Sequence, residues 1–395
     1  MSDLNLQEKM KRLDKLSEGF NKKKGKTMVG RVSQCEELQA ALRVEFIPTP
    51  SLNVNAALGG GWPKGRISIV SGNEDSGKTF ILLETIGKAM KENPNFMAGW
   101  LESEGSITED NLNQFGIDPD RFFYLEVDRE GAAEEALNVV ESALMTGSID
   151  MFVINSLKCL VPKEEFEKGM EQVQVGLQAR MNAKMMRKLT AIVDENNVAF
   201  VLVQHLTTQI GTMSRDPLIL AGGKAIRYGA SIICDMRKRS IQESDPISRE
   251  EGVKIGFSVT KNHVVTNRFP YLKTEYYGIF GIGTEIYLEA IDLAINQGIL
   301  AKAGAFIKVP DENGNPVVLE DGTKMQWQGT AKFRQYCMEN PEFFQDLKNK
   351  IEGKVEHLSN EEVTNAKLEN EGNLDDIEED VLEAAAKSTK KNKKK

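Results

Sequence analysis

One run of residues carries most of the information about the fold: Ile67-Ser68-Ile69-Val70-Ser71-Gly72-Asn73-Glu74-Asp75-Ser76-Gly77-Lys78-Thr79. Its second part fits the phosphate-loop pattern G-x-x-x-x-G-K-S/T, between a β-rich run and the helical residues 80–90. In such a loop, backbone N–H groups surround the phosphates, the lysine neutralises β- and γ-phosphate charge, and the last hydroxyl takes a Mg²⁺ position. We expect an ATP site made by Gly72, Asn73, Glu74, Asp75, Ser76, Gly77, Lys78 and Thr79, with Thr79 on the metal.

Short runs rich in Val, Ile and Phe alternate with helical segments on either side of this loop: residues 66–71, 97–101, 122–127, 150–155, 198–204, 231–236 and 253–259. Near-continuous apolar runs indicate strands that are buried on both faces of a parallel sheet. The last two runs are separated by a polar, turn-rich stretch without a long helix, which indicates a hairpin at one edge. The expected fold class is α/β, with a mainly parallel sheet flanked by helices.

The composition is that of a folded protein in a reducing compartment. Of the 395 residues, 40% are hydrophobic and 28% are charged, and the longest apolar runs have four to six residues. A bilayer span needs about 20, so we expect no membrane segment, and the N-terminus lacks the apolar core of a secretory signal. The four cysteines show no metal-like spacing, which favours free thiols in the cytoplasm. A net charge of −9 argues against coating of nucleic acid by bulk charge alone.

Changes in pattern divide the chain into four expected parts: an N-terminal arm (1–45), an ATPase core (46–282), a small α+β C-terminal domain (283–352) and a disordered tail (353–395). The arm has apolar residues at helical spacing among basic ones. Its narrow apolar stripe could lie on the chain's own core or on a neighbouring molecule. In the C-terminal domain, residues 286–296 and 331–351 have helical patterns. The tail holds seven acids within 371–383 and six lysines within 387–395, a block-charged composition typical of disorder.

Polar side chains end the predicted strands at the edge where ligands of open α/β sheets bind. Glu102 and Glu104 lie on the same side of one strand end, so either could polarise a water aimed at a γ-phosphate, or both could be solvated acids. Asn155 stands where an aspartate usually supports Mg²⁺ through water. Its amide can still accept from such a water, which predicts weaker metal support. His205 ends a further strand and either touches the γ-phosphate or packs in the core.

Two loops that follow these strands are candidates for contact with nucleic acid. The stretch of residues 206–223 is longer than an ordinary loop. Arg215 lies inside it, and Lys224 and Arg227 follow directly after it. Residues 162–175 lead into a helix on which Arg180 and Arg187 share a face with Lys184. This face suits contacts with a phosphate backbone, and a solvated charged face would have the same spacing.

Residues 5–352 resemble the RecA family of recombinases. The resemblance is carried by the phosphate loop and by further segments: Thr49-Pro50-Ser51-Leu52-Asn53, Gly59-Gly60-Gly61-Trp62-Pro63-Lys64-Gly65-Arg66, Gly176-Leu177-Gln178-Ala179-Arg180-Met181, Met186-Arg187-Lys188-Leu189, Gly222-Gly223-Lys224-Ala225-Ile226-Arg227-Tyr228 and Ala301-Lys302-Ala303-Gly304-Ala305. It implies a DNA-dependent ATPase that uses ATP and Mg²⁺ and forms helical homo-oligomeric filaments on single-stranded DNA. The implied reaction is homologous pairing and strand exchange with double-stranded DNA, in recombination and repair.

The same resemblance implies roles for residues of the ATP site. Glu104 looks like the catalytic carboxylate, and His205 stands at the position of the glutamine that senses the γ-phosphate. Asn111 stands at the position of an adenine-stacking tyrosine. Lys261 and His263 resemble the residues that reach the nucleotide across the subunit interface, with His263 in place of a lysine.

The two candidate loops would then be the family's DNA-binding loops, with Val175 and Ile210 at the apolar positions that separate stretched bases. The implied DNA-binding residues are Val175, Arg180, Arg187, Gln209, Ile210, Gly211, Thr212, Met213, Arg215, Gly222, Gly223, Lys224 and Arg227. The N-terminal helix and residues 28–32 would dock on the adjacent subunit.

Two alternatives remain open, and departures from the family pattern at Asn155, His205 and His263 support the first of them. One is a catalytically weakened RecA paralogue that acts as a recombination regulator. The other is a hexameric helicase motor built on the same core. In having a histidine at the sensor position, the chain resembles phage recombinases of the UvsX type. A bacteriophage origin, with action in the cytoplasm of a host cell, is therefore a further expectation.

Overall fold

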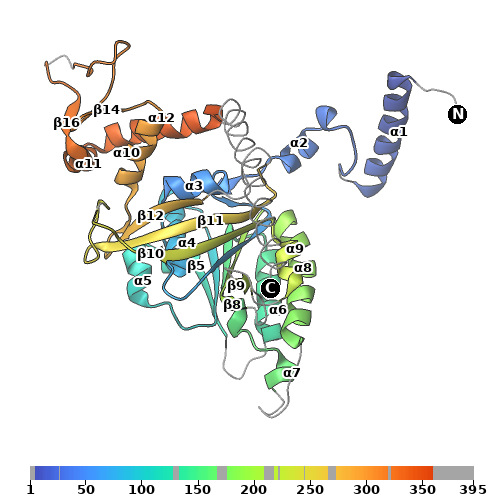
Figure 1. Cartoon of the computed structure of the whole chain (residues 1–395). Coiled ribbons are helices and arrows are strands. Elements are labelled where there is room, and N and C mark those ends of the chain that lie inside the picture. Colours follow the sequence, from blue (N-terminus) through green and yellow to red (C-terminus); the bar gives the residue numbers. More distant parts are fainter. Residues whose placement is uncertain are drawn as a thin grey trace, which may run out of the picture.

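A nine-stranded mixed sheet forms the centre of the computed structural model, which describes residues 5–25, 27–127, 133–166, 176–208, 218–220, 223–243, 245–265, 273–318 and 322–358 (Figure 1). The strand order is β13-β12-β11-β10-β3-β7-β6-β4-β5. The six strands from β10 to β5 run parallel, and β11, β12 and β13 are antiparallel. The bounds are β3 (Arg66–Gly72), β4 (Ala98–Glu102), β5 (Phe122–Glu126), β6 (Met151–Asn155), β7 (Ala199–Gln204), β10 (Ile232–Arg239), β11 (Gly252–Asn262), β12 (Lys273–Ile279) and β13 (Gly283–Thr284). The expected α/β fold class is confirmed.

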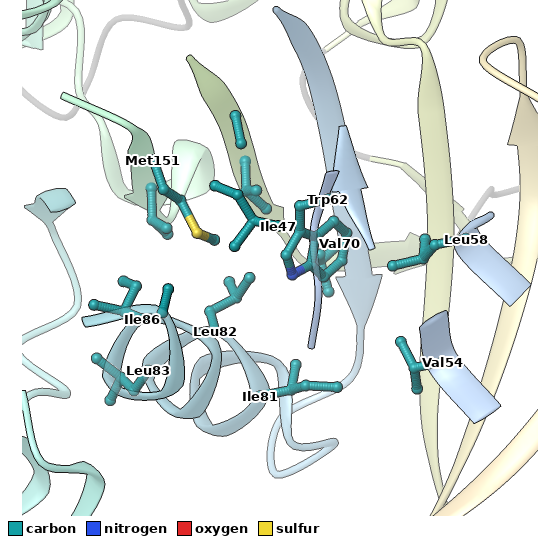
Figure 2. Close-up of a cluster of buried hydrophobic side chains, with 14 of the residues drawn as sticks. Ile47, Val54, Leu58, Trp62, Val70, Ile81, Leu82, Leu83, Ile86 and Met151 are labelled. Atoms are coloured by element: carbon teal, nitrogen blue, oxygen red, sulfur yellow. The ribbon is translucent and has the colours of Figure 1, made fainter. Parts of the chain in front are cut away.

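Helices cover both faces of this sheet. One face packs against α3 (Leu52–Leu58), α4 (Lys78–Glu92) and α5 (Glu109–Phe115), and the other against α6 (Ala133–Met145), α8 (Leu177–Glu195) and α9 (Lys224–Gly229). Within β6, Met151 and Val153 belong to the first apolar cluster, while Phe152 and Ile154 belong to the second. Figure 2 shows part of the first cluster, with Leu82 of α4 packed beneath the strands. Because both faces are covered there, central strands such as β6 and β7 are apolar along nearly their whole length.

The antiparallel edge is larger than the expected hairpin. β10 and β11 pair with Asp235 opposite Ser258, as the turn-rich stretch between them indicated. The sheet then continues through β12, whose residues Lys273 and Glu275 are exposed while Tyr276 is buried. The mixed composition of this strand, with charged and apolar residues interleaved, is the reason that its sequence did not read as a buried strand.

The N-terminal arm stands away from the body of the molecule (Figure 1). It consists of α1 (Leu6–Lys24), η1 (Val32–Gln34) and α2 (Glu36–Leu42). No residue of α1 is buried, and Leu6 and Leu16 of its apolar stripe are 68% and 65% exposed. The Asn21 side chain holds the returning chain, accepting from Met28 N at 2.9 Å and donating to Val29 O at 2.7 Å. The chain's own core therefore does not cover the apolar stripe.

The C-terminal part has its own apolar cluster, around α10 (Ile286–Asn296) and Trp327. A small sheet of β14 (Ala301–Ala303), β15 (Phe306–Lys308) and β16 (Gln326–Gln328) packs there. The expected helix over 331–351 is wrong as a single element, since it is divided into α11 (Gly329–Glu339) and α12 (Pro341–Leu358). Pro341 lacks a backbone N–H and therefore begins a helix rather than continuing one.

The remaining elements are short: β1 (Phe46–Ile47), β2 (Trp62–Pro63), η2 (Pro119–Arg121), η3 (Leu157–Cys159), α7 (Lys163–Phe166), β8 (Leu206–Thr208) and β9 (Leu218–Leu220). Within the described part of the chain, no helix is long and apolar enough to cross a membrane. The four cysteines form no disulfide in the structure. The tail beyond residue 358 lies outside the described residues.

Candidate nucleotide site

The phosphate loop connects β3 to α4 at the carboxyl edge of the sheet. Lys78 begins α4 and is almost fully buried, and its Nζ donates to Gly72 O at 3.1 Å and Asn73 O at 2.6 Å. Burial lowers the pKa of Lys78, and the nearby carboxylates of Glu104 and Asp75 act in the opposite direction. The ammonium is thus held at the centre of the loop, where the pattern predicts phosphate binding.

Two glycines give this loop its shape. Gly77 has φ +83° and directly precedes α4, a backbone conformation that L-residues rarely adopt. At Gly72, a Cβ atom would lie 2.4 Å from Met236 O and 2.5 Å from Ser76 Oγ. Side chains are therefore excluded at both positions, and the backbone of the loop stays accessible to a ligand.

The structure distinguishes Glu102 from Glu104, the two carboxylates that the sequence left equivalent in their possible role. Glu102 is 1% exposed, and it accepts from Trp100 Nε1 at 3.1 Å, Asn155 Nδ2 at 3.1 Å and Glu104 N at 2.7 Å. Its oxygens are used to fix the end of β4 and the backbone of Glu104. The oxygens of Glu102 are therefore occupied by donors of the protein itself. Glu104 is left as the candidate for the catalytic carboxylate.

Glu104 lies where three strand ends meet. Its Oε1 accepts from Ser156 Oγ, which follows β6, and lies 2.7 Å from His205 Nε2, which follows β7. The Glu104 side chain is 23% exposed and that of His205 is 14% exposed. Among the nearby carboxylates, Glu104 has the largest effect on the Lys78 ammonium. A partly exposed carboxylate thus stands beside the phosphate loop, oriented by two partners from other strands.

Asn155 is fully buried at the end of β6, and its hydrogen bonds fix the orientation of its amide. Nδ2 donates to Glu102 and to Ser106 Oγ at 3.0 Å. Oδ1 is buried and has no hydrogen-bond partner among the described residues. An acceptor without a partner fits the expected role toward a metal-bound water. The described residues contain no cluster of three or more His, Cys, Asp or Glu side chains that could hold a metal alone.

Three other residues predicted for the ATP site lie elsewhere in the chain. The Asn111 side chain caps α5, accepting from Thr108 N at 3.0 Å. Lys261 and His263 lie at the amino edge of the sheet, opposite the phosphate loop, because Asn262 pairs with Ile232 at the start of β10. They line a cavity of about 680 Å³ with Lys224, Arg227 and Tyr228. The structure does not bring Lys261 and His263 to the phosphate loop of their own chain.

Comparisons of the sequence with known proteins show which family the chain is similar to. The family model for the RecA N-terminal domain matches residues 11–284. Protein RecA of Aquifex pyrophilus is 32% identical over 350 residues, which cover 88% of this chain and 92% of that protein. Protein RecA of Thermus aquaticus is 30% identical over 344 residues, covering 87% and 94%. For Protein RecA of Clostridium novyi the values are 30% over 368 residues, covering 92% and 97%.

The chain belongs to the RecA family. This confirms the sequence-based recognition and its assignment to the ATP-dependent recombinases of DNA. Nothing in the comparisons favours a catalytically weakened RecA paralogue.

Of the RecA-type DNA residues predicted from sequence, five lie in the described part of the chain. Arg180 and Arg187 are exposed on α8, and Gly223, Lys224 and Arg227 begin α9, which packs on α8. The others lie outside the described residues: Val175, Gln209, Ile210, Gly211, Thr212, Met213, Arg215 and Gly222. The ends of the stretch 206–223 are paired, because β8 and β9 form an antiparallel ladder with Leu206 opposite Leu220. The loop is therefore shorter than its sequence indicated.

Lys261 also has a local role in this RecA-type chain. Its Nζ donates to the carbonyl oxygens of Arg227 (2.9 Å), Tyr228 (3.2 Å) and Ala230 (2.6 Å), at the carboxyl end of α9. Burial lowers the pKa of this ammonium, and the nearby Arg227 adds to the effect. A cation at the carboxyl end of a helix satisfies carbonyls that the helix leaves without partners.

Sequence reasoning missed two polar residues of the site. Ser156 holds Glu104, and its place directly after the apolar run of β6 was a usable signal. Asp235, 9% exposed on β10, lies beside the phosphate loop with its Oδ1 3.4 Å from Ser71 Oγ and its Oδ2 bound to Arg237 Nε at 2.6 Å. Its single acidic side chain within an apolar run was a weaker signal.

Proposed function

We propose that this chain is a DNA-dependent ATPase that assembles as a helical filament on single-stranded DNA and promotes homologous pairing and strand exchange with double-stranded DNA. Glu104 is its catalytic base, and ATP with Mg²⁺ binds at Gly72, Asn73, Glu74, Asp75, Ser76, Gly77, Lys78 and Thr79. The observation that carries the proposal is the contact of Glu104 with His205, which joins the phosphate-loop edge to the strand that leads into residues 206–223. The reaction takes place in the cytoplasm, that of the host in the case of a phage protein.

The residues divide the chemistry of hydrolysis among them. Lys78 binds the β- and γ-phosphates, and Glu104 orients the attacking water and accepts its proton, a role that contributes about 10²–10⁴ in rate. The Thr79 hydroxyl would be a ligand of Mg²⁺, and Asn155 Oδ1 would support the ion through a water. When bound, Mg²⁺ neutralises phosphate charge. Asn155 supplies an acceptor without a negative charge, so we expect weaker metal support than a carboxylate would give.

The two edges of the sheet are complementary in charge, which supports assembly between copies of the chain. The phosphate-loop edge carries Glu74, Asp75 and Glu104, whereas the cavity at the opposite edge is lined by Lys224, Arg227, Lys261 and His263. Stacking copies edge to edge would bring Lys261 and His263 to the neighbour's nucleotide. The uncovered stripe of α1 would pack on the adjacent subunit and bury its apolar side chains.

The test is ATP hydrolysis with and without single-stranded DNA, for the wild type and for Glu104→Gln, with negative-stain images of the same samples. We expect DNA-stimulated turnover in the wild type, a loss of about 10²–10⁴ in the variant, and helical filaments in both. Turnover without DNA stimulation and without filaments would contradict the proposal and favour a regulator. Closed rings would favour a helicase motor.

A further inference from the structure

The contact between Glu104 and His205 constrains the protons that the pair can hold. Glu104 Oε1 lies 2.7 Å from His205 Nε2 and also accepts from Ser156 Oγ. An ionised carboxylate accepts hydrogen bonds and donates none. While Glu104 is ionised, as a catalytic base must be, the hydrogen of this contact therefore lies on His205 Nε2.

Whether the second ring nitrogen, Nδ1, carries a hydrogen then depends on the charge of the imidazole. In a neutral ring with hydrogen on Nε2, Nδ1 has none and is an acceptor. The oxygens of a γ-phosphate are acceptors too, so Nδ1 of a neutral ring and a phosphate oxygen repel each other. A doubly protonated ring has a donor on each side. A glutamine at this position needs no such proton, because its amide nitrogen carries two hydrogens.

We propose that His205 holds Glu104 and the γ-phosphate together only as an imidazolium, so that productive ATP binding takes up one proton at this residue. This rests on the proposed function, because it requires ATP at the phosphate loop. His205 is then a positioning residue for Glu104 as well as a ligand of the γ-phosphate. The proton returns to solvent when phosphate leaves, so the one bond that forms and breaks is the N–H bond at Nδ1.

The other charged groups at this edge do not replace His205 in the role. From β4 come Glu102 and Glu104, from the phosphate loop Glu74, Asp75 and Lys78, and from β10 Asp235. Glu102 is already engaged with Trp100 and Asn155, and Lys78 binds its own loop. A bound triphosphate adds negative charge beside the ring, and an opposite charge at this range favours the charged form of a group.

The experiment measures proton uptake directly. The full chain is titrated with a non-hydrolysable ATP analogue and Mg²⁺ by calorimetry at pH 8, in two buffers with different heats of ionisation. We expect close to one proton taken up per nucleotide by the wild type, and none by His205→Gln, which still binds the analogue. His357→Gln in α12 is the matched control, with the same substitution in a helix outside the site, and should behave as the wild type.

The outcomes distinguish a failure of this inference from a failure of the proposed function on which it rests. Binding by the wild type without proton uptake, or equal uptake by His205→Gln, would overturn the inference alone. Absence of nucleotide binding by both proteins would overturn the proposed function and the inference with it.

A pH profile of DNA-stimulated hydrolysis gives a second readout that a merely structural role of His205 would not change. Imidazole ordinarily changes its charge between pH 5 and 8. We expect the KM for ATP of the wild type to rise by up to about tenfold per pH unit on the alkaline side, since one proton is linked to binding. The kcat should change less, and His205→Gln should show a flat KM. Parallel profiles for the two proteins would overturn the inference.

Discussion

Two carboxylates are buried to nearly the same degree in this chain but differ in the hydrogen bonds that they receive. Glu102, at the phosphate-loop edge, is 1% exposed and accepts from four groups: Trp100 Nε1, Glu104 N, Ser106 Oγ and Asn155 Nδ2. Glu289, on α10 where it meets α3, is 3% exposed. One of its oxygens accepts from Ser51 Oγ and Asn53 N, and the other is buried without a partner among the described residues.

The two carboxyl groups differ in how many of their oxygens receive hydrogen bonds, and at Glu289 the effect of burial outweighs the hydrogen bonds that are made. Burial raises the pKa of Glu289 to about 8, against the lowering effect of its hydrogen bonds to Asn53 and Ser51. Glu289 therefore keeps its proton at neutral pH. At Glu102, donors contact both oxygens, and the hydrogen bond from Glu104 N fixes the backbone of Glu104. Glu102, at the functional edge, receives donors on both oxygens, whereas Glu289, between α3 and α10, receives them on one oxygen only.

The largest expected effect is the pH dependence of Glu289→Gln. Between the ordinary pKa of 4.5 and the folded value of about 8, the folded chain holds a proton that the unfolded chain has lost. This contribution to stability is full below pH 4.5 and is lost as the pH rises to 8. At about 1.4 kcal/mol per pKa unit it amounts to on the order of 5 kcal/mol. Glutamine mimics the protonated acid at every pH.

The measurement is the difference in unfolding free energy between Glu289→Gln and wild type, by urea titration at pH 5.5 and 8.5. One pH unit above 4.5 the wild type has already lost part of this contribution, so we expect the variant to be more stable by about 1.4 kcal/mol at pH 5.5 and by a clearly larger margin at pH 8.5. Glu339→Gln, an exposed glutamate on α11, should show no such change. A difference that is the same at both pH values would show that Glu289 is ionised in the folded chain.

The next effect comes from Asn155→Asp, which gives Glu102 a carboxylate in place of a donor. The Asn155 Nδ2 atom lies 3.1 Å from Glu102 Oε2, and two carboxylates at that distance cannot both be ionised. We expect a loss of about 2–3 kcal/mol at pH 8, because a buried hydrogen bond to a charged group is replaced by repulsion. The loss should shrink as the pH falls, since a shared proton restores the contact.

A double-mutant cycle provides the control for this prediction. In Glu102→Gln/Asn155→Asp the donor and acceptor exchange places, and the amide introduced at position 102 can donate to the new carboxylate. We expect the double variant to be more stable than the sum of the two single losses, by a coupling measured from melting at pH 8. Additive losses would show that the two side chains act independently.

Local patterns were sufficient to predict much of the fold. The phosphate loop lies within eight residues, and the runs that form β3, β6 and β7 are apolar because both faces of each strand are buried. β12 carries charged residues among its apolar ones, so its sequence lacked this signal. β8 and β9 are separated in the sequence by residues 209–217, so no local pattern encodes their pairing.

The site could be predicted as a set of residues but not as an arrangement. The sequence placed Glu102, Glu104 and Asn155 at strand ends, and that placement follows from the spacing of apolar runs. Which carboxylate is structural depends on Asn155, 53 residues further along the chain, and the pairing of Glu104 with His205 spans 101 residues. Such contacts follow from the order of strands in the sheet, which periodicity does not contain.

The smallest expected effect tests whether each donor to Glu102 matters equally. Ser106 Oγ donates to Glu102 Oε2 at 3.3 Å but is exposed, so a water can replace it in Ser106→Ala. We expect a loss of about 0.5 kcal/mol in unfolding free energy. The matched comparison is Ser51→Ala, because Ser51 Oγ is fully buried, donates to Glu289 at 2.9 Å and also accepts from Val54 N. That variant should lose about 1–2 kcal/mol. Equal losses in the two variants would mean that solvent does not reach the donors of Glu102, and that the edge is closed before a nucleotide binds.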